Sequence, residues 1–141
     1  MTATPSWVAP AIAQARVARL ATTGPDGVVR LVPICFAIVE ERVVSAVDHK
    51  PKSTEKLHRL DDISSSRVAT VLIDHYDDDW TQLWWVRIRG AAQLHSDDEL
   101  LVAQARAALI AKYSQYQAEP PGGPVYSVAL DELRAWRFHK P

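Results

Sequence analysis

The segment LWWVRIRGAAQLH, residues 83–95, limits the possible fold more than any other part of the chain. Over more than ten positions, apolar side chains alternate with side chains that are mostly polar or charged. A period of two is the pattern of a β-strand that buries one face. The predicted inward residues are Trp84, Val86, Ile88, Ala92 and Leu94, and the predicted outward residues are Trp85, Arg87 and Arg89.

Shorter segments of the same kind occur before and after this strand. The residues between them include Gly-Pro-Asp-Gly at 24–27 and a Pro- and Gly-rich loop at 117–124, which favour turns. The three N-terminal strands are expected to form a β-meander, and the last two a hairpin joined by Asp131 and Glu132. Strands are predicted over residues 19–23, 28–39, 43–47, 68–74, 125–130 and 134–140.

The strand predicted over residues 28–39 is apolar at both sets of alternating positions, so we expect both of its faces to be covered. Three helices are predicted between the strands. The first, residues 6–18, begins at a Ser6 cap, and the second covers 53–61 with Leu57 and Leu60 facing inward. The third begins at the capping box Ser96–Glu99 and ends near Lys112.

This order of elements predicts a mainly β chain with helical inserts, of the α+β class, folded as a small β-barrel. With 141 residues the chain fits one domain spanning 1–141, which is large enough to bury roughly two-thirds of its unfolded surface. We find no internal repeat that would favour a different architecture.

Composition excludes several classes of protein. The net charge of −1 argues against a nucleic-acid binder that relies on overall charge. The single cysteine, Cys35, lies in a predicted strand and cannot form an internal disulfide, which favours a reducing compartment and a cytoplasmic location. The chain lacks a basic leader and an apolar stretch of membrane-spanning length, so neither export nor a membrane partner is expected.

Motifs for nucleophilic or metal-dependent catalysis are missing. There is no Gly-x-Ser-x-Gly, packing is the better explanation of Cys35, and the five histidines have no metal-ligand spacing. The acidic run Asp77–Asp79 lacks the Gly and the distal Glu of a calcium loop, so we interpret it as a solvated loop. We therefore expect no metal.

A basic segment, HKPKSTEKLHRL at residues 49–60, follows a predicted strand and opens a predicted helix. Lys50, Lys52 and Lys56, with Arg30 on a neighbouring strand, would suit a phosphate group, because helix N-termini and arginine forks both bind phosphate oxygens. A cationic helix face, with Arg30 paired to a nearby acid, explains the same residues equally well. The sequence alone leaves both interpretations open.

The chain resembles the split β-barrel proteins related to pyridoxamine-phosphate oxidase over nearly its whole length. The matching segments are ARLATTGPDGVVRLVPICFAI, VDHKPKSTEKLHRL, RVATVLID, VRIRGAAQL and AWRF. Within that family it is most similar to the branch of probable F420-dependent enzymes of actinobacteria, for which HYDDDW followed by LWWVRIRG is the most distinctive part. The resemblance implies an FMN-binding-like split barrel and a flavin or deazaflavin cofactor.

The resemblance also implies roles for individual residues. Arg30 and Lys56 match family positions that contact the cofactor phosphate, Lys50 and Lys52 match a basic segment more loosely, and Pro33 and Thr22 with Thr23 would lie near the ring system. Glu55 stands where the oxidases often have a second cation, and Arg134, Arg137 and His139 match the oxidases' substrate-binding pattern only in part. The family is typically a homodimer whose cofactor sites are completed by both subunits.

Three tryptophans lie close together, Trp80, Trp84 and Trp85. Trp80 and Trp85 are expected either at a subunit interface or as walls of a pocket for a flat ring, and Trp84 in the core. His75, Tyr76 and Arg87 are candidates for substrate binding, and no catalytic residue is assigned.

Three hypotheses for function follow. The first is an oxidoreductase that uses reduced F420 to transfer hydride to a small electrophilic organic substrate, the second is an FMN-dependent enzyme of the same fold, and the third is a non-catalytic carrier of flavin, deazaflavin or haem. The extra cations Lys50 and Lys52 favour the longer anionic tail of F420. Fold alone cannot decide among the three, because function is determined by the site.

Overall fold

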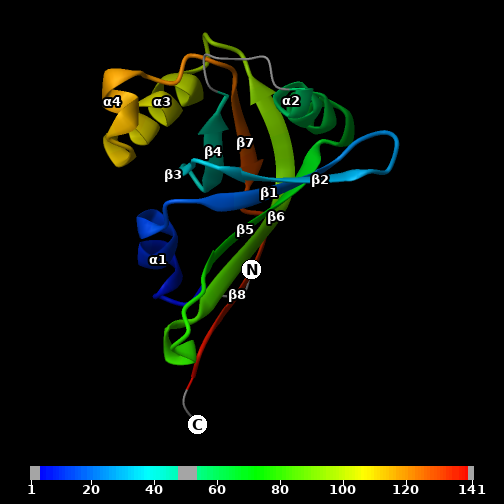
Figure 1. Cartoon of the computed structure of the whole chain (residues 1–141). Helices are drawn as coiled ribbons and strands as arrows, with labels where there is room; N and C mark the ends of the chain where they lie inside the picture. Colours follow the sequence, from blue (N-terminus) through cyan, green and yellow to red (C-terminus); the bar gives the residue numbers. More distant parts are fainter. Residues whose placement is uncertain (1–3, 48–53, 140–141) are drawn as a thin grey trace.

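The computed structural model describes residues 4–47 and 54–139, with the backbone alone for residues 54–57. Within these residues eight strands form one sheet with the order β2-β1-β5-β6-β7-β4-β3, and β8 also pairs with β6 (Figure 1). The predicted mainly β fold with helical inserts is confirmed. The strands are β1 (Ala18–Thr23), β2 (Val29–Ile34), β3 (Ala37–Val39), β4 (Arg42–Ala46), β5 (Val68–His75), β6 (Trp84–His95), β7 (Val125–Ala129) and β8 (Glu132–Arg137).

The long strand β6 connects the two halves of the barrel. Residues 84–89 of β6 pair with β8 and residues 84–91 with β5, whereas residues 92–95 pair with β7. The predicted burial holds along most of the strand: Val86, Ile88 and Ala92 are buried, and Arg87 and Arg89 are exposed. Leu94, predicted to face inward, is 39% exposed.

The prediction of a C-terminal hairpin is wrong, because β7 and β8 do not pair with each other but both pair with β6. The link between them crosses β6 at Gly90, where a Cβ atom would lie 1.9 Å from the carbonyl oxygen of Ala129. The backbone N–H of Ala91 donates to a carboxylate oxygen of Asp131 at 2.9 Å, which holds the crossing in place. Glycine is required here for close approach of two backbones.

The strand predicted over residues 28–39 is interrupted at Cys35 and Phe36. β2 pairs with β1, and β3 pairs with β4 at the other end of the strand order, so the N-terminal part forms two separate hairpins rather than a meander. Within one chain only one face of β2 is covered, since Val29 and Leu31 are 63% and 66% exposed. Cys35 therefore lies in a link between strands, partly exposed.

The helices lie on the outside of the barrel. α1 (Val8–Gln14) has Trp7 as its N-cap without a side-chain cap bond, so the predicted Ser6 cap is wrong. Figure 1 shows α2 (Thr54–Ser66) on one side of the upper half and α3 (Leu100–Lys112) with α4 (Gln115–Ala118) on the other. A short 3-10 helix, η1 (Trp80–Gln82), precedes β6.

The bounds of all three predicted helices differ from the structure, and α1 ends at Gln14 instead of residue 18. α2 continues past Asp61, because Asp62 and Ile63 are both buried against the sheet, and it ends before Arg67, whose φ is 60°. α3 begins at Leu100 instead of Ser96. Only half of the predicted capping box is present: the Glu99 carboxylate accepts from the backbone N–H of Ser96 at 2.6 Å, and no side-chain cap bond opens the helix.

Two clusters of buried residues fill the interior. The larger one packs α1 and Ile63 of α2 against the inner face of the sheet, and the smaller one packs α3 against β3, β4 and β7. Among the residues that the structure describes, no helix is long and apolar enough to cross a membrane.

Candidate functional site

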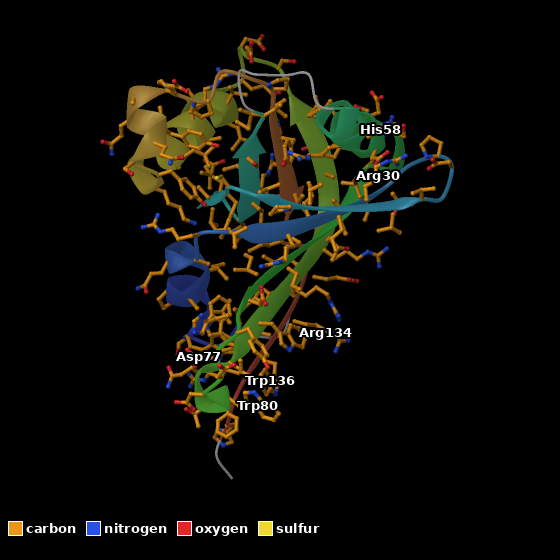
Figure 2. All side chains as sticks on the ribbon, viewed as in Figure 1. Arg30, His58, Asp77, Trp80, Arg134 and Trp136 are labelled. Atoms are coloured by element: carbon orange, nitrogen blue, oxygen red, sulfur yellow. The ribbon has the colours of Figure 1, made fainter. Side chains whose placement is uncertain are left out.

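Arg30 lies in a network of polar side chains between β1, β2 and α2 (Figure 2). Its Nη1 donates to both carboxylate oxygens of Asp62 at 3.1 Å, and its Nη2 donates to Asp26 at 3.2 Å. The hydroxyl of Thr22 donates to the same Asp62 carboxylate at 2.9 Å. The structure therefore agrees with the second interpretation of the sequence, in which Arg30 is paired with nearby acids.

This network fixes α2 to the sheet. The Asp62 side chain is only 3% exposed, and each of its oxygens accepts a hydrogen bond from β1 or β2. Gly24 makes room for it, because a Cβ there would lie 2.8 Å or less from Arg30 and Asp62. The Val28 backbone N–H and, after it, the Arg30 guanidinium hold the pKa of Asp26 below its ordinary value. Arg30 is thus neutralised within the fold, and its side chain positions α2, which includes the last seven residues of the basic segment, 54–60.

The basic segment is described only in part. Lys50 and Lys52 lie outside the described residues, and Lys56 belongs to the first turn of α2, with its side chain also outside the description. Three residues after Lys56, Arg59 points toward the sheet, with Nη1 3.5 Å from the hydroxyl of Tyr126. The Arg59 Nε is buried and has no hydrogen-bond partner among the described residues.

Arg59 was not selected from the sequence, although it belongs to the quoted basic segment and its spacing from Lys56 is one helical turn. A buried guanidinium N–H without an acceptor is energetically unfavourable. An anionic ligand near the start of α2 would supply the acceptor that the Arg59 Nε lacks among the described residues. A flavin or deazaflavin phosphate has the oxygens that such a donor requires.

A second group of predicted residues meets on the opposite, outward face of the sheet. One pocket of about 310 Å³, where β5 ends and β6 begins, is lined by His75, Tyr76, Trp85 and Arg87. Trp136 of β8 completes it opposite Trp85. Trp136 was missed as a site residue, although it lies in the AWRF segment.

Trp80 and Pro33 are not among the residues that line this pocket. Trp80 is 64% exposed on η1, and Pro33 is exposed on β2, opposite Arg19 of β1. Trp84 packs edge-on against Trp7 with ring centroids 6.1 Å apart and contacts the main core, as predicted.

The predicted site residues therefore form two groups on opposite faces of the sheet. Thr22 and Arg30 lie on the face that α2 covers, whereas Trp85 and Arg87 lie on the outward face. Figure 2 also separates them along the molecule, with Arg30 near α2 in the upper half and Trp136 in the lower half. Within one chain these groups do not surround a common ligand.

Another hollow in the described part of the chain, of about 560 Å³, was not predicted from the sequence. It is lined by Arg16, Cys35, Lys112 and Tyr113 with residues 114–116 and 119–121. The Lys112 Nζ is buried, has no hydrogen-bond partner among the described residues, and lies 3.7 Å from the ring centroid of Phe36. Burial and, after it, the charge of Arg16 lower the pKa of Lys112 to about 8.

A Ser–His–Glu arrangement occurs where β6, β7 and α3 meet. The His95 Nε2 lies 2.7 Å from the Ser127 hydroxyl, and its Nδ1 lies 3.1 Å from a Glu99 carboxylate oxygen. Ser127 is only 1% exposed and lines neither of the two pockets described above, so a substrate cannot reach its hydroxyl. We interpret these residues as a polar contact that fixes α3. Within the described ranges, no three His, Cys, Asp or Glu side chains are grouped as metal ligands.

Comparisons with known proteins agree with the fold. Residues 6–140 match the family model described as pyridoxamine 5'-phosphate oxidase. No curated protein matches the sequence. A conserved hypothetical protein of Mycobacterium tuberculosis has a similar structure, with a TM-score of 0.76, 16% identity, and coverage of 97% of this chain and 86% of the other.

Two further structures share the fold. The heme storage protein of Vibrio cholerae has a TM-score of 0.71 at 9% identity, covering 93% of this chain and 92% of that chain. The FAD binding protein of Mycobacterium smegmatis has a TM-score of 0.67 at 20% identity, and the match covers 97% of this chain and 98% of that chain. At these identities the similarity shows the fold alone. The family model, which matches almost the entire chain, shows more: this protein belongs to the pyridoxamine 5'-phosphate oxidase family.

Proposed function

We propose that this protein is an oxidoreductase that binds a cofactor of the flavin type, with its phosphate at the start of α2. The observation that supports this best is the buried Arg59 Nε, which has no acceptor among the described residues and lies one turn after Lys56 in a helix fixed to the sheet through Asp62. Family membership supports a redox role, and the neighbours named as FAD-binding support a flavin.

The finer proposal concerns which cofactor is bound. We propose reduced F420, which would transfer hydride to a small electrophilic organic substrate, with FMN as the alternative. The F420 proposal is based on Lys50 and Lys52 in the sequence, since extra cations suit a longer anionic tail. Two neighbours are named as FAD-binding proteins, which supports a flavin instead, and a direct titration decides between the cofactors.

When bound, the cofactor would supply the hydride chemistry, and the protein would bind the cofactor and orient it toward the substrate. Lys56 and Arg59 would hold the phosphate of the cofactor by charge-assisted hydrogen bonds. Asp62 keeps Arg30 and Thr22 in position and so fixes the helix. On the outward face Trp85 and Trp136 provide flat apolar walls, and Arg87, with its guanidinium 5.6 Å from the ring centroid of Trp85, adds a positive charge.

We propose a homodimer, which the separation of the two groups of residues supports. In this proposal the phosphate binds at the start of α2, whereas the aromatic pocket lies on the outward face of the sheet, so a ligand that reaches both would contact two copies of the chain. Exposed apolar side chains on the outward face, Val29, Leu31 and Val68, suit burial against a second copy. We further propose a cytoplasmic location, with a small molecule as the substrate.

A non-catalytic carrier is the second candidate. One neighbour is named as a heme storage protein and another as a heme binding protein, both at low identity. The aromatic pocket contains His75, which is half exposed and 3.9 Å from Asp77, and a histidine is a common axial ligand of haem iron. Retention of a cofactor without turnover of any donor and acceptor pair would favour this candidate over the enzyme.

The test is to titrate purified protein separately with F420 and FMN, following tryptophan quenching and the cofactor's own emission. We expect binding in the micromolar range or tighter for one of them. Replacing Lys56→Ala or Arg59→Gln removes a charge-assisted contact to the phosphate and should weaken that binding by about 1.5–3 kcal/mol.

The matched control is Arg67→Gln, which removes an equal charge from an exposed position just after α2. Its affinity should stay within about twofold of the original, since exposed charges at a distance are screened by salt. Equal affinity in Lys56→Ala, Arg59→Gln and the unmodified protein would contradict the phosphate assignment. Arg30→Ala is unsuitable here, because it would leave the buried Asp62 without its partner.

A further inference from the structure

The hollow at the end of α3 is lined by side chains from distant parts of the chain. Arg16 comes from the link between α1 and β1, Cys35 from the link between β2 and β3, and Lys112 from the end of α3. Its volume of about 560 Å³ is enough for a small organic molecule. Figure 1 shows α1, α3 and α4 on one side of the barrel and α2 on the other. The hollow is therefore separate from the start of α2, where the cofactor phosphate is proposed.

The amine of Lys112 lies in apolar surroundings. Its Nζ is buried, lies 3.7 Å from the ring centroid of Phe36, and has no hydrogen-bond partner among the described residues. The ring stabilises the ammonium form in part, whereas burial without an acceptor opposes it. Lys112 also lines the hollow, and because the lysine stem is flexible, rotation about its bonds brings Nζ from the ring into the hollow.

Arg16 takes the role that a cation usually has at the end of a helix. Cations near a helix C-terminus interact favourably with the last carbonyl groups. Here the Arg16 Nη1 donates to the backbone carbonyl of Lys112 at 2.7 Å, and the guanidinium lies 5.8 Å from the ring centroid of Tyr113. The amine of Lys112 is therefore not required to cap α3, and its burial needs another explanation.

One carboxylate, that of Glu119, also lines the hollow. Glu119 is exposed, and within the described part of the chain it forms no ion pair with Arg16 or Lys112. After burial, the charges that act on the pKa of Lys112 are those of Arg16, which lowers it, and of Cys35, which raises it. The two cations are therefore not neutralised by Glu119.

These surroundings make Lys112 a nucleophile. A lysine becomes nucleophilic at neutral pH when it is desolvated in an apolar pocket or lies next to another cation. Burial and, after it, Arg16 lower the pKa of Lys112 from 10.5 to about 8. At pH 7 about 10% of this side chain is then the neutral amine, against about 0.03% of an ordinary lysine. Only the neutral form has the electron pair that attacks a carbonyl carbon.

We propose that this hollow is a covalent binding site in which Lys112 forms an imine with a small oxo acid, an aldehyde or ketone that carries a carboxylate. The Nζ electron pair forms the bond to the carbonyl carbon. Both protons of the amine end on the carbonyl oxygen, which leaves as water, so the step needs no oxidant or reductant.

The other lining residues suit the same ligand. The guanidinium of Arg16 binds a carboxylate by charge-assisted hydrogen bonds. The rings of Tyr113 and Tyr116, in edge contact with centroids 5.7 Å apart, provide an apolar wall. This activity goes beyond the proposed function and does not depend on it, since the cofactor is assigned to other residues.

Reductive trapping tests the proposal on the unmodified protein. Purified protein is incubated with 4-formylbenzoate and cyanoborohydride at pH 7, and peptide mass spectrometry gives the rate of modification at each lysine. The chain has four other lysines as internal controls, Lys50, Lys52, Lys56 and Lys140. We expect Lys112 to react about tenfold faster than their mean or more, a smaller margin than the ratio of neutral fractions because Nζ must first leave the Phe36 ring.

The pH dependence of trapping provides a second readout that simple exposure would not produce. The rate at Lys112 should level off above about pH 8, where its amine is already neutral, whereas the rates at the other lysines should continue to rise toward pH 10.

The role of Arg16 is tested with the uncharged 4-formylbenzamide as a comparison probe. We expect 4-formylbenzoate to modify Lys112 faster than the amide does, and Arg16→Gln to remove that preference. Arg67→Gln is the matched control, because it removes an equal charge from an exposed position outside the hollow, and it should retain the preference.

Modification of Lys112 no faster than that of the other four lysines would overturn the proposal without any variant. Equal rates for the two aldehydes at Lys112 would overturn the carboxylate as part of the ligand. Because neither F420 nor FMN is present, failure of trapping leaves the cofactor titration unaffected, and trapping in a protein that binds neither cofactor would support this site and refute the proposed function alone.

Discussion

Arginine side chains have different partners on the two faces of the sheet. On the face under α2, Arg30 donates to two carboxylates, one of them almost completely buried. On the outward face, Arg87 and Arg134 lie opposite each other and have no carboxylate partner among the described residues. A charge neutralised inside the fold fixes an element in place, whereas a charge without an internal partner is available to a ligand.

This difference changes the interpretation of the candidate site. Arg30 matches the family position for a phosphate contact, yet in the structure its hydrogen bonds hold α2 against β1 and β2. The cations left for a phosphate at that end come from the basic segment, including Arg59. We therefore assign Arg30 a positioning role and give Arg59 and Lys56 the direct role.

The largest expected change in stability comes from a substitution on the face under α2, where Arg30 is neutralised by Asp62. Asp62→Asn leaves Arg30 and the Thr22 hydroxyl facing an amide where they had a buried carboxylate. Losing one partner of a buried charged network is strongly destabilising, so the free energy of unfolding should fall by roughly 2–4 kcal/mol. Urea denaturation at neutral pH measures this fall.

Asp61→Asn is the matched control, since Asp61 is the exposed neighbour in the same helix, and we expect a change within about 0.5 kcal/mol. The double variant Arg30→Gln with Asp62→Asn should cost less than the sum of the two single changes. Additive costs would show that the two side chains do not act as a pair.

An intermediate effect is expected at Lys112, which is half-buried and has no carboxylate partner in the part of the chain that the structure describes. Its pKa in the folded protein is about 8, below its ordinary value of 10.5. Between these values the unfolded chain binds more protons, so stability rises with pH across this interval and the penalty is fully present below pH 8.

Lys112→Met should therefore stabilise the protein by roughly 1–2 kcal/mol at pH 7, after allowance for partial exposure and for the contact with Phe36. Thermal or urea unfolding at pH 7 and again near pH 10 provides the comparison, and the gain should shrink at the higher pH. A gain that is the same at both values would rule out the charge of Lys112 as its cause.

The smallest effect sharpens the outward side of the comparison. Without an anion, Arg134→Gln relieves the repulsion with Arg87 and should raise the free energy of unfolding by about 0.2–1 kcal/mol. Inorganic phosphate at constant ionic strength should raise the Tm of the unmodified protein more than that of the variant. Destabilisation by Arg134→Gln in phosphate-free buffer would contradict repulsion between the two arginines.

Local patterns predicted most elements of this fold. The alternation around Val86 and Ile88 placed β6 and its two faces correctly, and His75, Tyr76, Trp85 and Arg87 do share a pocket. Such patterns depend on neighbouring residues, which the sequence displays directly.

What the sequence did not predict depends on contacts between distant segments. The crossing at Gly90 replaces the expected hairpin because β7 and β8 both need β6 as a partner, and local turn signals contain no information about that choice. The pairing of Arg30 with Asp62 joins residues 32 positions apart. Asp62 was missed because a polar residue within a helix is ordinarily exposed, whereas here two strands supply its donors.

The central claim is that the start of α2 holds the phosphate of a flavin-type cofactor, and titration with F420 and FMN tests it most directly. The account predicts binding in the micromolar range or tighter for one of the two, weakened by about tenfold or more in Arg59→Gln and unaffected by Arg67→Gln. If neither cofactor binds, the basic segment is a solvated helix face and the claim is contradicted.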